Sequence, residues 1–279
     1  MSLPAPITLV TDSTCDLPHE LITAFKIHVV PVLINQSNQS FRDGVDISRE
    51  KFYSELAQSQ PYPTTSACSS SDFAQVFATI DAQSEILCVT LSQKLSGMYN
   101  AARLAMEQTG RKVHLLDSEH ISMGLGWQVL AAAEAIANGD GVHTVLEKTA
   151  QVRQKVRTFA VLTTLEFARR SGRVSALQAG LGNLLSLCPI LHLNDGLIKP
   201  FVNQRTFKKA VGVLRETVEK FAPLNRLAVM HANASEAAHE LAEHLQAFCA
   251  HSAQIVPITP AVGLHTGPGA LGVALVAAE

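Results

Sequence analysis

The segment ITLVTDSTCDLPHELITAFKIHVVPVLI, residues 7–34, indicates the fold class of this chain. Residues 7–11 and 27–34 are short apolar runs typical of buried strands, and residues 15–25 between them have the pattern of a helix. Asp16 is a candidate N-cap for that helix, and Pro18 suits its first turn. A helix that joins two buried strands predicts a β-α-β unit.

The same alternation continues along the first half of the chain. Apolar runs predict strands at residues 85–91, 112–117 and 158–164, and helical patterns cover about 96–108 and 122–137. Alternating strands and helices are typical of an α/β layer built on a mainly parallel sheet. We therefore expect an N-terminal α/β domain over residues 1–155.

The second half has a different pattern. A helix is expected over 173–185, and strands at 189–193 and 197–201 flank an Asn-Asp-Gly sequence that predicts a tight hairpin turn. The remaining expected elements are helices at 208–221 and 234–248 and strands at 226–232, 253–259 and 272–278. Hairpins mixed with helices predict a C-terminal α+β domain over residues 156–279, and the absence of a linker predicts an extensive interface between the two domains.

Composition narrows the classes of partner. Of the 279 residues, 47% are hydrophobic and 16% are charged, and the formal net charge is −2. Such a balance gives no long-range attraction to nucleic acid. No apolar run approaches the length of a membrane span, which argues against stable membrane insertion and leaves transient membrane contact open. The N-terminus lacks the pattern of a signal peptide, and five scattered cysteines suit free thiols, so a cytoplasmic location is expected.

The stretch GLHTGPGALG, residues 263–272, matches the glycine spacing of a dinucleotide-binding loop. That loop requires a following helix and an acidic residue about 20 positions later, but the chain continues only to residue 279. Pro268 also removes a backbone N–H that a phosphate would use. No nucleotide cofactor is predicted here, and His265 and Thr266 become candidates for binding a polar head group.

Ser96 has two interpretations from its position alone. It follows a predicted strand and precedes a predicted helix, as a hydrolase nucleophile would, with His265 as base and Asp117 as acid. It also suits the N-cap of the following helix, and spacing alone favours that interpretation. The chain contains no G-x-S-x-G sequence.

Other polar groups could bind an anion or a metal. Thr65 and Ser66 belong to the hydroxyl-rich stretch TTSACSSS, residues 64–71, which is either an anion-binding loop or a solvated turn. Arg173 lies in RRSGRVS, residues 169–175, where arginines suit a carboxylate or simply face solvent. His239 and His244 in HELAEH are five residues apart, about 140° around a helix, so no metal site is predicted.

The order of these motifs along the chain resembles the DegV family. The resemblance rests on seven segments that span residues 7 to 276: ITLVTDSTCDLP, TTSACSSSDF, VTLSQKLSGMYNAARLA, LLDSEHISMGLG, LTTLEFARRSGRVS, PILHLNDGLIKPFVNQRT and HTGPGALG. The chain departs from the family pattern at Ala67, Cys68, Met98, Ser171 and Cys188. Glycine is the usual residue at the position of Ser171.

The resemblance implies a two-domain α/β protein that binds a long-chain fatty acid at the domain interface. The acyl chain would lie in a buried apolar tunnel, and no catalytic residue and no other cofactor would be required. The implied head-group residues are Thr65, Ser66, Ser96, Gly97, His265 and Thr266, with Arg173 near the head group and the surface that faces a kinase.

The resemblance also implies a partner. In bacterial fatty acid kinase systems, relatives present the bound fatty acid to a separate kinase subunit, which forms an acyl-phosphate with ATP for phospholipid synthesis. Two other functions remain open, a lipid or thioester hydrolase that uses Ser96 and His265 and a lipid-sensing regulatory protein without a kinase partner.

Overall fold

The computed structural model describes residues 5–173 and 187–278. The strands are β1 (Ile7–Asp12), β2 (His28–Val30), β3 (Leu33–Gln36), β4 (Gln39–Arg42), β5 (Thr64–Ser66), β6 (Glu85–Thr90), β7 (Val113–Asp117), β8 (Val156–Val161), β9 (Cys188–Asn194), β10 (Leu197–Gln204), β11 (Leu224–His231), β12 (Gln254–Pro257) and β13 (Leu271–Ala277). The α-helices are α1 (His19–Ala24), α2 (Arg49–Leu56), α3 (Ser70–Thr79), α4 (Met98–Thr109), α5 (Met123–Ala137), α6 (Val142–Lys155), α7 (Glu166–Arg170), α9 (Phe207–Glu219), α10 (Ser235–Leu245) and α11 (Pro260–Thr266). Short 3-10 turns cover Ser13–Cys15 and Gln246–Phe248.

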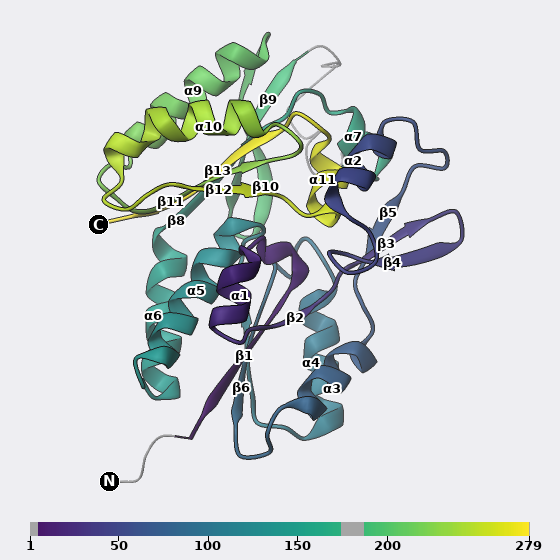
Figure 1. The fold of residues 1–279 in the computed structure, drawn as a ribbon, viewed down its shortest axis with the longest axis vertical. Coiled ribbons are helices and arrows are strands. Elements are labelled where there is room, and N and C mark those ends of the chain that lie inside the picture. Colours follow the sequence, from purple (N-terminus) through teal and green to yellow (C-terminus); the bar gives the residue numbers. More distant parts are fainter. Residues whose placement is uncertain (1–4, 174–186, 279) are drawn as a thin grey trace.

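The first half forms the expected parallel layer. Four strands pair in the order β2-β1-β6-β7, and every pair is parallel. Helices α5 and α6 lie on one side of this sheet and α3 and α4 on the other (Figure 1). Among the described residues, no helix is both long and apolar enough to span a bilayer.

The strand expected over residues 27–34 is two strands in different sheets. β2 pairs with β1, whereas β3 pairs with β4 and β5 in a three-stranded antiparallel sheet. Pro31 lies between them and has no N–H to donate to a ladder, so the chain changes direction there. Thr64–Ser66 of the hydroxyl-rich stretch also forms a strand, β5, rather than a loop.

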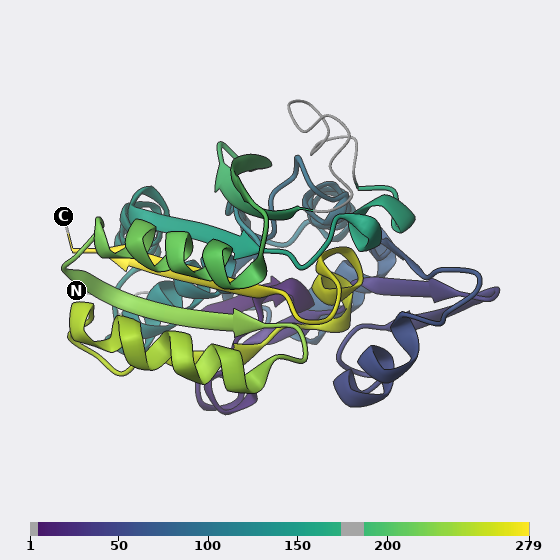
Figure 2. The ribbon, with the colours of Figure 1, turned by 90° about the horizontal axis from the view of Figure 1, so that it is seen from above.

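The second half is built on a mixed sheet, seen from above in Figure 2. Its six strands have the order β10-β9-β8-β13-β11-β12, with β11 and β12 parallel and the other pairs antiparallel. Asp195 and Gly196 between β9 and β10 have φ angles of 52° and 73°, as a two-residue hairpin turn requires. The hairpin predicted from Asn-Asp-Gly is confirmed.

The two faces of the mixed sheet belong to different apolar clusters. Val161 and Val273 face a cluster closed by α9 and α10. Leu191 and Ala274 face a second cluster, which extends from Leu9 of β1 to Val276 of β13. All strands of the mixed sheet follow residue 155, and the division at that residue stays a prediction. The helix expected over 173–185 lies outside the described residues except for Arg173.

The sequence had indicated that Asp16 caps the first helix, but in the structure it does not. The N-cap position of α1 is Pro18, and Asp16 is buried in the left-handed conformation with φ 53°. Its carboxylate accepts hydrogen bonds from the Ser122 hydroxyl and, at 2.8 Å, from the Thr259 N–H. Burial of this carboxylate raises its pKa to about 7, even though both hydrogen bonds favour the ionised form.

Replacing Asp16 by asparagine should remove part of the pH dependence of stability. Between about pH 4, where an unfolded aspartate loses its proton, and about pH 7, the folded chain still binds a proton that the unfolded chain has released. The free energy of unfolding should therefore fall as the pH rises through this range, by roughly 2–4 kcal/mol from this group.

Urea denaturation of the wild type and Asp16→Asn at several pH values measures the difference. The exposed turn carboxylate of Asp195 offers a matched control, Asp195→Asn. An Asp16→Asn variant whose stability changes with pH as steeply as that of the wild type would contradict the prediction.

Candidate functional site

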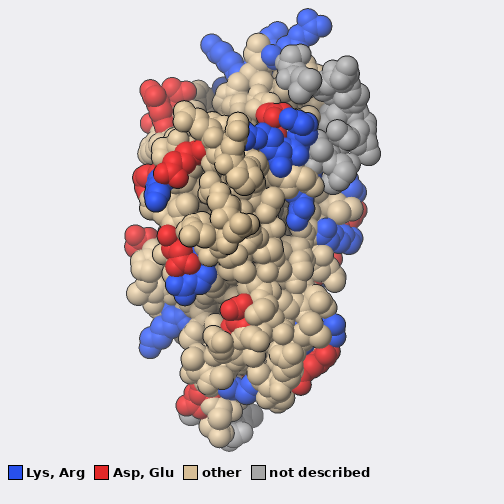
Figure 3. Space-filling model, turned by 90° about the vertical axis from the view of Figure 1, so that its right-hand side faces the viewer, with Lys and Arg blue, Asp and Glu red and all other residues tan. Residues whose placement is uncertain are grey.

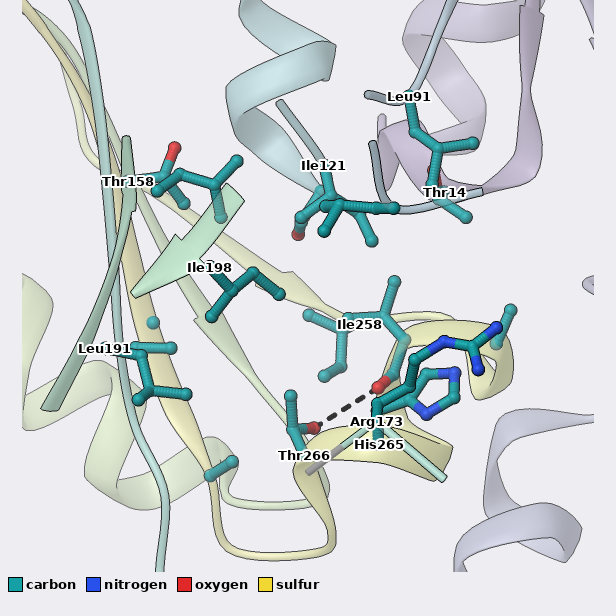
Figure 4. Close-up of a pocket in the computed structure, with 18 of the residues that line it drawn as sticks. Thr14, Leu91, Ile121, Thr158, Arg173, Leu191, Ile198, Ile258, His265 and Thr266 are labelled. Carbon is teal, nitrogen blue, oxygen red and sulfur yellow. Dashed lines mark hydrogen bonds between the residues drawn. The ribbon is translucent and has the colours of Figure 1, made fainter. Parts of the chain in front are cut away.

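A cavity of about 240 Å3 lies between the parallel sheet and the six-stranded sheet (Figure 4). Thr14, Leu91 and Ile121 reach it from segments that follow β1, β6 and β7. The carboxyl edge of a parallel sheet is where α/β proteins place their ligands. The remaining wall is mainly aliphatic and includes Ala160 of β8, Leu191 of β9 and Ile198 of β10, together with residues of α11 and β13.

One end of the cavity is polar. Every head-group residue expected from the sequence lines it: Thr65, Ser66, Ser96, Gly97, Arg173, His265 and Thr266. Figure 4 shows Arg173, His265 and Thr266 together at one end, and Thr158 and Leu191 toward the other. These groups come from β5, from the segment before α4, from the segment after α7 and from the last turn of α11, so the fold brings distant motifs to one place.

His265 joins two hydroxyl groups at the polar end. Its Nε2 lies 2.9 Å from Thr65 Oγ1, and its Nδ1 lies 2.8 Å from Ser171 Oγ. Burial, with a smaller contribution from the positive charge of Arg173, lowers the pKa of His265 to about 4. The imidazole is therefore neutral at pH 7 and carries one N–H.

Other groups at this end retain donors that a ligand could use. The Thr266 hydroxyl is 3.5 Å from the carbonyls of Val262 and Gly263, which is long for a hydrogen bond. Gly97 is the N-cap of α4, so the cap interpretation of Ser96 is wrong by one residue. The first turn of a helix offers unpaired N–H groups and favours an anion.

The hydrolase triad suggested by the sequence is not assembled. Both nitrogens of His265 are within hydrogen-bonding distance of other hydroxyls, and among the described residues Ser96 makes no side-chain bond to it. The Asp117 carboxylate instead accepts hydrogen bonds from the N–H groups of Gln93 and Glu119. The geometry needed for an activated serine is therefore missing.

Comparison with known proteins agrees with this architecture. The family model for the DegV family matches residues 6–278. The chain belongs to the DegV family. A DegV domain-containing protein of Staphylococcus aureus is 31% identical over 269 residues, covering 95% of this chain and 96% of the relative. Protein DegV of Bacillus subtilis is 31% identical over 275 residues, with 96% and 98% covered.

Solved structures of DegV proteins share the fold. A DegV family protein of Thermus thermophilus, described as binding a fatty acid, superposes with a TM-score of 0.89 at 31% identity and covers 98% of this chain and 99% of its own. The fatty acid binding protein DegV of Bacillus subtilis gives 0.87 at 29% identity with the same coverage. The family and fold expected from the sequence motifs are confirmed.

The three arginines near the polar end have different surroundings. Arg169 pairs with Glu166 at 2.7 Å. The guanidinium of Arg170 lies 4.2 Å from the centre of the Tyr62 ring and donates to two backbone carbonyls of the segment that follows α2. Arg173 is exposed and also lines the cavity, so of the three it is the one placed to meet a bound anion.

The surface around these arginines is only weakly charged. The right-hand face in Figure 1 carries α2 and α7. Figure 3 shows basic groups on this face separated by acidic groups and by uncharged surface. Among the described residues of this face, the two signs of charge are mixed, as the low content of charged residues suggested.

Two tyrosines that sequence reasoning missed hold α11 in place. The Tyr62 hydroxyl donates to the Leu264 carbonyl at 2.6 Å, and the Tyr53 hydroxyl donates to the Ile258 carbonyl at 3.3 Å. Tyr62 and Tyr53 are 202 and 205 residues away in sequence from the carbonyls that they contact, so no local pattern predicts these contacts. Leu264 is next to His265, so the Tyr62 contact supports the polar end, whereas the Tyr53 contact fixes the segment that leads into α11.

Gly267 ends α11 in a conformation that is almost restricted to glycine, with φ 75° and ψ 162°. A Cβ atom at this position would lie 2.1 Å from the Phe167 ring. Gly267→Ala should therefore lower the free energy of unfolding by roughly 2–4 kcal/mol, through backbone strain and overpacking, and displace His265.

Chemical denaturation measures this loss. Gly212→Ala is the matched control, because Gly212 lies in α9 with open space around the added methyl group, and alanine there should stabilise the chain by roughly 0.5–1 kcal/mol. Equal effects of the two substitutions would contradict the role assigned to Gly267.

Proposed function

We propose that this chain binds one long-chain fatty acid in the cavity. The carboxylate would lie at the polar end, and the acyl chain would extend toward Leu191 and Ile198 of the six-stranded sheet. The observation that supports this most directly is a mainly apolar cavity that has Arg173, His265 and Thr266 together at one end (Figure 4). DegV structures that are 31% and 29% identical to this chain are described as fatty acid binding proteins.

The polar end suits a carboxylate. A fatty acid is ionised at pH 7, and a buried carboxylate needs several donors to replace water. Hydroxyls of Thr65, Ser96 and Thr266 and the backbone at Gly97 could donate to it. Because His265 is neutral, the opposite charge would come from Arg173.

The apolar part of the cavity should determine affinity. Burying about 14 methylene groups at roughly 0.8 kcal/mol each gives about 11 kcal/mol before the cost of association. A hydrogen bond to a charged group contributes about 1.5–3 kcal/mol. The acyl chain would therefore hold the ligand, and the polar groups would orient its carboxylate.

We further propose that the chain presents this carboxylate to a separate fatty acid kinase subunit. Gly97 and Arg173 at the polar end are exposed, whereas Leu162 and Leu191 of the aliphatic wall are buried. A carboxylate held at the exposed end would be accessible to a second protein while the acyl chain stayed covered. The DegV resemblance supports this partner.

Native mass spectrometry of the purified protein, followed by denaturation and lipid identification, tests the binding function directly. We expect one retained fatty acid of about 14–18 carbons per chain, the length for which about 14 methylene groups would be buried. A protein that is ligand-free and remains so after incubation with fatty acids would refute the proposal.

Replacing Ser96 or His265 by alanine should separate binding from presentation. The acyl chain still contributes most of the affinity, so the fatty acid should be retained near the wild-type level. Acyl-phosphate formation with ATP and the kinase subunit of the same organism should fall at least about tenfold, because Ser96→Ala removes one donor to the charged carboxylate and His265→Ala removes the group that positions the Thr65 hydroxyl.

Equal losses of binding and acyl-phosphate formation would contradict this division of roles. A wild-type protein that holds fatty acid but supports no acyl-phosphate formation would favour the lipid-sensing function instead. Hydrolysis of a chromogenic acyl ester that is lost in Ser96→Ala would favour the hydrolase.

A larger side chain in the wall should shorten the acceptable acyl chain. Ala160 of β8 lines the cavity, and Ala160→Leu adds three carbon atoms there. Competition between fatty acids of different length should show a loss for chains of about 18 carbons and little change for about 12, at roughly 0.8 kcal/mol per methylene excluded. Ala247→Leu, at an exposed site in the turn after α10, is the control, and an unchanged length profile in Ala160→Leu would count against the assigned tail path.

A further inference from the structure

Ser171 is a buried hydroxyl at the polar end that the proposed function does not use. Its side chain is 5% exposed, and its Oγ lies 2.8 Å from His265 Nδ1 and 3.2 Å from the Ala168 carbonyl. On the other side of the imidazole, Nε2 lies 2.9 Å from Thr65 Oγ1. The three side chains form one chain of hydrogen bonds that runs from the end of α7 to the cavity.

Only two arrangements of donors and acceptors are possible in this series of hydrogen bonds, because the neutral imidazole carries one N–H and each hydroxyl carries one hydrogen. In the first arrangement, Thr65 donates to Nε2, Nδ1–H donates to Ser171, and Ser171 donates to the Ala168 carbonyl. In the second, Ser171 donates to Nδ1, Nε2–H donates to Thr65, and the Thr65 hydroxyl hydrogen is released toward the cavity. The two arrangements differ in which nitrogen of the neutral imidazole carries the hydrogen.

Each arrangement suits one state of the cavity. Without a ligand, the first arrangement makes three hydrogen bonds among these side chains and the Ala168 carbonyl, and the second arrangement makes two. A carboxylate beside Thr65 reverses the preference, because in the first arrangement it would face a lone pair of the threonine, whereas in the second it receives a hydrogen bond. The Ala168 carbonyl loses Ser171 in the second arrangement but keeps its 2.9 Å bond from the Arg173 N–H, so it is not left unpaired.

We propose that Ser171 is a positioning residue that lets His265 change tautomer when a fatty acid carboxylate binds. The Nδ1–H form serves the ligand-free state and the Nε2–H form serves the bound state, and the imidazole stays neutral in both. One proton leaves Nδ1 and one arrives at Nε2 by exchange with water, so the net charge of the ring does not change. This inference rests on the proposed fatty acid function, and glycine at position 171 would offer no such hydroxyl.

Nitrogen-15 NMR of the histidine side chains tests the proposal on the delipidated full chain, with His265→Gln to assign the signals. We expect a protonated Nδ1 in the free protein and a protonated Nε2 after addition of oleate. In Ser171→Ala, the free protein should lose the preference for Nδ1–H, and oleate should bind at least as tightly as it does to the wild type, because the substitution removes two hydrogen bonds from the ligand-free arrangement and one from the bound arrangement. Ser171→Thr retains the hydroxyl and should restore the preference for Nδ1–H and the wild-type affinity for oleate.

Ser235→Ala is a matched control, because the Ser235 hydroxyl lies 3.4 Å from the Nδ1 of His239 on exposed α10. It should change neither the His265 signals nor oleate binding. Oleate binding with the same tautomer before and after, or with both nitrogens protonated, would overturn the proposal and leave the binding function intact. A wild-type protein that binds no oleate would overturn both, and an unchanged free spectrum in Ser171→Ala would remove the role of Ser171.

Discussion

The buried carboxylates of Asp16 and Asp43 bind the backbone at the start of α11, and the polar end of the cavity depends on this contact. Asp16 accepts from the Thr259 N–H at 2.8 Å and Asp43 accepts from the Ala261 N–H at 3.1 Å. A helix of seven residues is too short to be stable alone, so its position must come from tertiary contacts. With the tyrosine contacts and the glycine at its end, α11 is fixed along its whole length, and His265 is fixed with it.

The two aspartates that support α11 and the histidine on it are buried, and burial shifts their pKa values. Burial raises the pKa of Asp16 to about 7 and raises that of Asp43, and it lowers that of His265 to about 4. All three shifts favour the neutral form, so the surroundings of the cavity oppose charge in general. Arg173 is the exposed cation at the polar end, and a single anion beside it would balance that charge.

The sequence predicted those features that local chemistry determines. The helix expected over 122–137 is α5, and the Asn-Asp-Gly turn lies where its φ preferences place it, because both signals are complete within a few residues. The proposed head-group residues come from motif order, since each motif alone also suits a cap, a turn or a solvated surface. Asp16 was assigned wrongly because its partners are 106 and 243 residues away, and no local pattern separates such a carboxylate from a helix cap.

The position of β13 in the mixed sheet constrains when the cavity can form during synthesis. This strand lies between β8 and β11 at the centre of the sheet, although it is the last strand of the described chain. The wall of the cavity and the α11 contacts to residues some 200 positions earlier therefore stay incomplete until residues up to Ala277 have left the ribosome. Contacts of such long separation form slowly, so the apolar wall of the cavity stays incomplete in the nascent chain until β13 inserts.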